Sequence, residues 1–71
     1  MNKSIEDQIL EFVQNRYKIK ESIAPRHVHI RFDIEIIRAE KILDTLTQKN
    51  KIVKYHDKEY QEDRYTPSKK N

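Results

Sequence analysis

Eleven basic or polar side chains, gathered in three groups along the chain, have the chemistry to bind nucleic acid. The first group is Arg26, His27, His29 and Arg31, the second is Arg38, Lys41, Thr45 and Gln48, and the third is Lys51, Lys54 and Arg64. Arginine and lysine bind phosphate oxygens, arginine also forks onto guanine, and glutamine pairs with adenine. These residue types predict contacts with nucleic acid, although each is also an ordinary choice for a solvated surface position.

The overall charge favours a polyanionic partner only mildly. Fifteen lysines and arginines against twelve acidic residues give a net charge of +3 and a pI of about 9.2. A basic pI is typical of nucleic-acid-binding modules, but many small domains carry a similar charge. The charge is therefore compatible with this function without requiring it.

The sequence predicts neither an active site nor a metal or cofactor site. Glycine is absent, which excludes glycine-rich phosphate loops, and cysteine is absent, which excludes disulfides and zinc–thiolate centres. The serines Ser4, Ser22 and Ser68 lie near no histidine–acid arrangement. His27 and His29 have no third ligand close in sequence, so a metal ion is not expected. We also expect no pocket for a small-molecule substrate.

Length and hydropathy predict one small domain over residues 1–67, followed by a basic tail at 68–71 that we expect to be disordered. A chain of 71 residues buries only about 60% of the surface that its unfolded form exposes, so its core is small. Dimerisation is one way to stabilise such a domain without disulfides. No apolar run is long enough to cross a bilayer, and the N-terminus does not resemble a secretory signal, so we expect a cytoplasmic protein.

The first helix is predicted over residues 4–18. Ser4 and Asp7 make a start that is similar to a capping box. Apolar residues recur behind them at helical spacing, at Ile5, Ile9, Phe12 and Val13. In the connector that follows, Ile19 and Ile23 are expected to pack back onto the core.

Residues 27–36 allow two interpretations. Their apolar and polar side chains alternate, which is typical of a strand. The alternative is a short helix at 25–31, which begins at Pro25 and places Val28 one turn before Phe32. A strand here would give the protein a three-stranded sheet and make the fold a small α+β sandwich.

A long amphipathic helix is predicted next, over about residues 34–50. Its apolar face is marked by Ile36, Ala39, Ile42, Leu43 and Leu46. Asp33 is expected to cap its start, and Asn50 is expected to take the left-handed conformation at its end.

Two short strands are predicted at 51–55 and 64–66, and the polar stretch 56–63 between them predicts a hairpin with a long loop. Residues 57–63 carry four acidic side chains against one lysine. Phosphate would repel such a tip, so we expect it to point away from a duplex or to contact a protein.

The order of these elements resembles the winged helix-turn-helix family. The resemblance is carried by Ala39-x-x-Ile42-Leu43-x-x-Leu46, then Gln48-Lys49-Asn50-Lys51-Ile52-Val53, and Tyr65-Thr66-Pro67 as the returning strand. The chain departs from the family pattern in lacking a glycine before the wing and in the alternation of its second helix. The resemblance implies an α+β fold with three helices and a C-terminal two-stranded β-wing, and it favours the helical interpretation of 25–31.

The resemblance also implies that the helix at about 34–50 reads the major groove of double-stranded DNA. Arg38 is then expected on guanine, Gln48 on adenine and Lys41 on phosphate. The group at 26–31 would meet backbone phosphates, more strongly when its histidines are protonated. The predicted outward face of the long helix is Ile34, Ile37, Arg38, Lys41, Asp44, Thr45 and Gln48.

The function that follows is a small sequence-specific transcription regulator that acts as a homodimer on DNA, with no membrane partner. The alternative is a protein-docking module on the same fold, which an exposed Ile34–Ile37 pair and the acidic wing tip would suit. Binding to RNA or single strands would need aromatic side chains on one open surface, and the four tyrosines are scattered.

Overall fold

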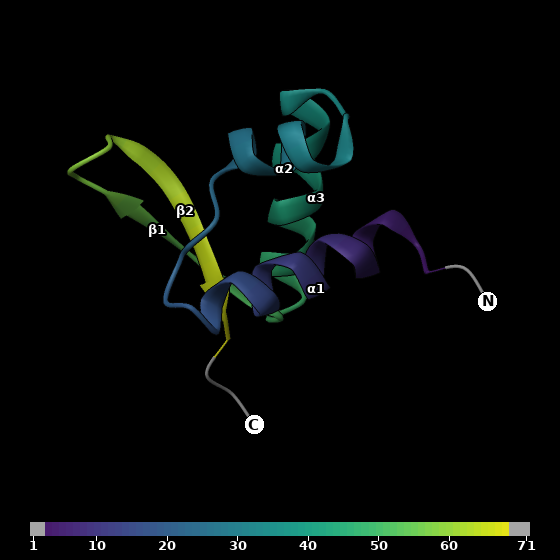
Figure 1. The fold of residues 1–71 in the computed structure, drawn as a ribbon, viewed down its shortest axis with the longest axis horizontal. Helices are drawn as coiled ribbons and strands as arrows, with labels where there is room; N and C mark the ends of the chain where they lie inside the picture. Colours follow the sequence, from purple (N-terminus) through teal and green to yellow (C-terminus); the bar gives the residue numbers. More distant parts are fainter. Residues whose placement is uncertain (1–2, 69–71) are drawn as a thin grey trace.

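The computed structural model describes residues 3–68, in which three helices precede a two-stranded antiparallel hairpin (Figure 1). The helices are α1 (Ile5–Tyr17), α2 (Pro25–Phe32) and α3 (Ile36–Gln48), and the strands are β1 (Ile52–Asp57) and β2 (Glu62–Pro67). This is the predicted α+β fold with a winged-helix layout, in which the hairpin is the wing. No helix within residues 3–68 is long and apolar enough to cross a membrane.

The start of α1 is fixed by its cap. The Ser4 hydroxyl oxygen accepts the backbone N–H of Asp7 at 3.1 Å, which satisfies one of the donors that a helix leaves open at its first turn. Ile9 and Val13 on its inner face are fully buried. The prediction of this helix is confirmed, with bounds one residue shorter at each end.

The ambiguous stretch forms a helix, which confirms the second interpretation. Pro25 occupies the first turn of α2, where its missing N–H costs nothing, and the N–H of Ala24 donates to His27 Nδ1 at 3.0 Å. Val28 is buried, and Phe32 packs edge-to-face on Phe12 of α1 with ring centroids 5.6 Å apart. The strand-like alternation arises because apolar Ile30 is 76% exposed on the outer side of the helix.

The turn between α2 and α3 differs from the prediction in one respect. Asp33 does not cap the start of α3; it ends α2 in the left-handed conformation, with φ 57° and ψ 48°. Aspartate tolerates this conformation better than most residues because its short side chain can bond locally. The residue before α3 is Glu35, whose side chain makes no capping hydrogen bond.

The hairpin has longer strands and a shorter loop than predicted. Its register runs from Ile52 opposite Pro67 to Asp57 opposite Glu62, so only residues 58–61 form the turn. The long-loop prediction was wrong because polar side chains on an exposed ribbon do not interrupt the backbone ladder. Asp57 Oδ1 closes the turn by accepting the N–H groups of Glu59 at 2.8 Å and Tyr60 at 3.1 Å.

The core lies where α1, α2, α3 and the base of the hairpin meet. Ile23 in the connector exchanges two backbone hydrogen bonds with Tyr65 of β2, at 3.0 and 2.7 Å, which ties the connector to the wing. The expected burial of Ile23 is confirmed, whereas Ile19 is 61% exposed and does not reach the core. The buried cluster comprises Ile9, Val13, Ile23, Val28, Ala39, Leu43, Leu46, Ile52 and Tyr65.

The backbone after α3 and the backbone after β2 both have defined conformations. Asn50 has φ 62°, so the predicted left-handed end of the long helix is confirmed. The N–H of Ser68, the first residue of the predicted tail, donates to Lys51 O at 3.1 Å. Residues 69–71, the rest of that tail, lie outside the described residues.

Candidate nucleic-acid interface

The outer face of α3 presents cations that no protein group neutralises. Arg38 and Lys41 are exposed, and within residues 3–68 neither side chain forms an ion pair or a hydrogen bond. Gln48 is exposed on the same side two turns later. Thr45 lies between them, half-buried, with its hydroxyl donating to Lys41 O at 2.9 Å. We call Arg38, Lys41, Thr45 and Gln48 the α3 outer face.

Two residues that the sequence placed on this face lie elsewhere. Ile34 is partly buried against the core, because it precedes the helix rather than continuing it. Asp44 turns toward the wing, where it accepts a hydrogen bond from Tyr65 Oη at 3.0 Å and lies 3.5 Å from Lys54 Nζ. Ile37 is outward as predicted, with 66% of its surface exposed.

Arg26 connects α2 to the wing. Its Nε and Nη2 donate to the two carboxylate oxygens of Glu62, at 2.9 and 3.1 Å. This paired geometry raises the pKa of Arg26 and lowers the pKa of Glu62, because each charge stabilises the other. The Arg26 guanidinium therefore has a carboxylate partner before any phosphate approaches it.

His27 does not supply the acid-dependent charge that the sequence suggested. Its Nδ1 accepts the N–H of Ala24, so this nitrogen is unprotonated in the folded chain. Burial lowers the pKa of His27, and the neighbouring charges of Arg26 and Arg64 lower it further. The side chain acts as a neutral cap of α2.

The C-terminal end of α2 holds the other two members of the first group, which lie beside the turn into α3. His29 Nδ1 is 2.6 Å from Ile34 O, an arrangement that requires the proton on Nδ1. The Arg31 guanidinium lies over the Phe32 ring, 5.2 Å from its centroid, and within residues 3–68 it forms no ion pair. Both side chains are exposed.

Most of the cationic charge on the wing is bound internally. Lys54 lies between Asp44 and Asp63, at 3.5 and 3.6 Å. The Arg64 side chain is only 11% exposed and donates to Ser22 Oγ at 2.6 Å, to Ser22 O at 2.9 Å and to Glu62 at 2.6 Å. Lys51 is exposed at the base of β1.

A cleft of about 460 Å³ between α3 and the wing is acidic. Glu40 and Asp44 of α3 face Glu62 and Asp63 of the wing across it, and Arg26 and Lys54 are the cations that line it. Burial and the hydrogen bond to Asp44 raise the pKa of Tyr65, whose hydroxyl therefore stays protonated at the floor of this cleft. The cleft would repel a phosphate backbone, so this side of the wing is not part of a nucleic-acid interface.

No family model, curated protein or solved structure matches the chain.

The structure separates the eleven predicted residues by their surroundings. The α3 outer face, Arg31, His29 and Lys51 remain accessible, whereas Arg26, His27 and Arg64 are held by hydrogen bonds and Lys54 lies near two acids. The pairing that divides them joins residues far apart in the chain, such as Arg26 and Glu62, which are 36 positions apart. No local pattern in the sequence could reveal it.

Proposed function

We propose that this protein binds double-stranded DNA as a small transcription regulator and inserts α3 into the major groove. The observation that carries the proposal is the α3 outer face, where Arg38 and Lys41 are exposed and unpaired within residues 3–68. An α-helix fits the major groove, and a side chain that has no internal partner is not diverted from a base or phosphate. Ordinary solvated residues would also be exposed, which is why binding must be measured.

Three residues of this face and three residues near it have roles suited to their chemistry. Arg38 donates two hydrogen bonds to guanine, and Gln48 pairs with the edge of adenine. Lys41 and Lys51 contact phosphates, and Arg31 reaches the backbone from the end of α2. Ile37 lies beside Arg38 and packs against a thymine methyl group.

The small number of accessible cations sets the expected strength of binding. With about three phosphates neutralised per protomer, the logarithm of affinity falls with the logarithm of salt concentration with a slope of about −3. A single protomer would therefore bind weakly at physiological salt. We propose that a cytoplasmic homodimer reads two half-sites, one helical turn of DNA apart.

Fluorescence anisotropy of a labelled duplex at two salt concentrations tests this proposal. Wild-type protein should bind at low salt and weaken as salt rises, and Arg38→Ala/Lys41→Ala should abolish binding. The matched control is Lys18→Ala/Lys58→Ala, which removes the same charge from two exposed lysines outside the α3 outer face. Equal losses in the two double variants would reduce the effect to net charge.

The second candidate is a protein-docking module, which one observation favours. Ile30 and Ile37 are 76% and 66% exposed, and the cleft beside α3 is acidic. The sequence predicted an exposed Ile34–Ile37 pair as the docking surface. Ile34 packs against the core, so only Ile37 of that pair is exposed. A folded protein that fails to bind any duplex at low salt would favour docking over DNA binding.

A further inference from the structure

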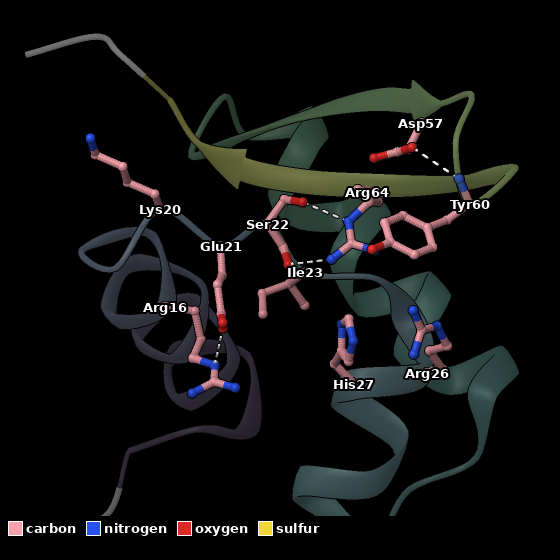
Figure 2. Close-up of a pocket in the computed structure, with 10 residues that line it drawn as sticks. All are labelled: Arg16, Lys20, Glu21, Ser22, Ile23, Arg26, His27, Asp57, Tyr60 and Arg64. Atoms are coloured by element: carbon pink, nitrogen blue, oxygen red, sulfur yellow. Dashed lines mark hydrogen bonds and ion pairs between the residues drawn. The ribbon is translucent and has the colours of Figure 1, made fainter.

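A second cleft lies on the other face of the hairpin, and cations surround it (Figure 2). It has a volume of about 410 Å³, and its walls come from the end of α1, the connector, the start of α2 and the hairpin. Arg64 of β2 lines it, whereas the neighbouring Asp63 and Tyr65 line the acidic cleft. Successive strand residues point to opposite faces, so Arg64 faces this cleft and Asp63 and Tyr65 face the acidic one, while Arg26 lines both. The prediction that the protein has no pocket did not anticipate this cleft, which is formed where residues 16–27 meet residues 57–64.

Four basic side chains bring positive charge to this cleft: Arg16, Lys20, Arg26 and Arg64. Arg16 and Lys20 are exposed at its edge, whereas Arg64 is nearly buried and immobilised by Ser22 and Glu62. Within residues 3–68, Lys20 forms no ion pair. The cleft therefore combines fixed charge on one wall with adaptable charge on the other.

The Ser22 side chain lines the cleft, and its hydroxyl proton has no acceptor within residues 3–68. Its oxygen already accepts hydrogen bonds from Tyr55 Oη at 2.9 Å and from Arg64 Nε at 2.6 Å. A hydroxyl has two acceptor lone pairs and one donor, so the remaining capacity of Ser22 is its own proton. An acceptor in the cleft would complete its hydrogen bonding.

His27 supplies a second neutral donor. Since Nδ1 accepts the N–H of Ala24, the proton of the neutral ring sits on Nε2. The ring stands on the first turn of α2 and points into the space below Ser22 and Arg64 (Figure 2). Burial and the charges of Arg26, Arg64 and Arg16 lower the pKa of His27, which keeps it in this neutral form at neutral pH.

The acidic groups near the cleft are already compensated. Asp57 Oδ1 accepts two backbone N–H groups of the turn, and Glu62 is held by both Arg26 and Arg64. Glu21 lies 3.2 Å from Arg16 Nε, at the exposed edge. Arg26 and Arg64 share the single carboxylate of Glu62, so these three side chains together keep a net positive charge, and Lys20 has no acidic partner within residues 3–68.

We propose that this cleft binds the phosphate group of a small phosphorylated ligand. Ser22 Oγ and His27 Nε2 donate to the phosphate oxygens, Arg64 provides fixed positive charge behind them, and Arg16 and Lys20 close over the ligand from the edge. The volume exceeds that of a phosphate ion and falls within the usual range for small-molecule sites, so the cleft has room for an organic portion beside the phosphate. The site lies on the opposite face of the hairpin from α3, and the proposal does not depend on DNA binding.

Inorganic pyrophosphate is the probe, and ¹H–¹⁵N correlation spectra of the full chain at constant ionic strength are the readout. Saturable shifts are expected at the amides of Ser22, Ile23 and His27. The Arg16→Gln/Lys20→Gln variant should weaken this binding at least about tenfold. Lys18→Gln/Lys58→Gln, which loses the same charge outside the cleft, should bind as the wild type does. The spectrum of each variant shows whether its fold is retained.

Shifts that never saturate, or equal weakening in both double variants, would overturn the proposal. Duplex binding tests whether the phosphate belongs to a small molecule or to a nucleic-acid backbone. If the ligand is a small molecule, the cleft variant and its charge-matched control should bind duplex equally well. A greater loss of duplex binding in the cleft variant would assign the phosphate to the nucleic-acid backbone.

Discussion

The cations of α3 and those of the wing have the same chemistry but different surroundings. On α3, Arg38 and Lys41 project from one helical face and meet no acid within residues 3–68. On the wing, Lys54 and Arg64 are bound to acids and to Ser22. The basic side chains of the wing bind groups of the protein itself, whereas Arg38 and Lys41 of α3 remain exposed to solvent.

This difference has a structural cause. The wing is a two-stranded ribbon, and such a hairpin is marginal unless other elements support it. Arg26 and Arg64 converge on Glu62, so they fasten the ribbon to α2 and to the connector. α3 needs no such fastening, because Ala39, Leu43 and Leu46 already anchor it in the core. A basic residue is therefore a candidate for binding DNA only when its fold does not already use it.

The largest expected effect of this difference is on stability. Arg64→Ala would leave Glu62 and Ser22 without a nearly buried partner, and we expect a loss of about 2 kcal/mol in the free energy of unfolding. Arg38→Ala should change it by less than about 0.5 kcal/mol. Urea denaturation of both variants measures this. Equal losses would show that α3 uses its arginine as the wing does.

A smaller effect is expected at His27, which caps α2. His27→Ala removes the acceptor for the Ala24 N–H and should cost about 1 kcal/mol. His27→Gln keeps an acceptor at the third helical position and should recover most of that loss. Thermal unfolding at pH 7.5 distinguishes the two, and no difference between them would rule out the capping role.

His27 also predicts a pH dependence. Its folded pKa lies below the ordinary value of 6.5, so the unfolded chain binds the proton more tightly. The contribution of neutral His27 to the free energy of unfolding should be fully present above pH 6.5. It should decline as the pH falls from 6.5 toward the folded pKa. His27→Gln should lack this decline. A wild-type protein that gains stability over this interval would contradict the assignment.

The structure also shows how far sequence patterns reach. The bounds of α1 followed from Ser4 and the apolar spacing, because caps and periodicity act over a few residues. The helix at α2 could not be separated from a strand by pattern, since exposed Ile30 imitates the alternation and only packing of Val28 and Phe32 reveals the helix. The α3 outer face was predictable from a helical rotation of about 100° per residue, but the same rule wrongly added Ile34 and Asp44 to it.

What the sequence could not provide was the pairing between segments. Arg26 and Arg64 were plausible phosphate contacts until their convergence on Glu62 was visible. The cationic cleft was hidden for the same reason, because Arg64 and Ser22, which bond to each other in its wall, are 42 positions apart in the chain. Such sites depend on tertiary structure, and composition gives no sign of them.

The ion pair between Arg26 of α2 and Glu62 of the wing should weaken in acid. The folded pKa of Glu62 lies below its ordinary value of 4.5, so its contribution is complete above that value and is lost as the pH falls through the folded pKa. Glu62→Gln should therefore lose less stability below pH 4.5 than the wild type does. Parallel acid-unfolding curves for the two proteins would contradict this link.

The smallest effect is expected at Lys54. Its side chain is 40% exposed, and its two acidic partners are 3.5 and 3.6 Å away. Exposed ion pairs of this kind contribute about 0–1 kcal/mol. Lys54→Ala should change the urea midpoint only slightly, and a loss as large as that of Arg64→Ala would mean that the wing is fastened at this point as well.

The duplex affinities of an α3 variant and a wing variant test whether the exposed cations of α3 bind DNA and those of the wing do not. Duplex affinity should be measured against salt for wild type, Arg38→Ala/Lys41→Ala and Lys54→Ala/Lys58→Ala, the last two losing equal charge from α3 and from the wing. We expect the α3 variant to lose binding, while the wing variant stays within about threefold of wild type and keeps its salt slope. Binding that survives in the α3 variant and fails in the wing variant would contradict it.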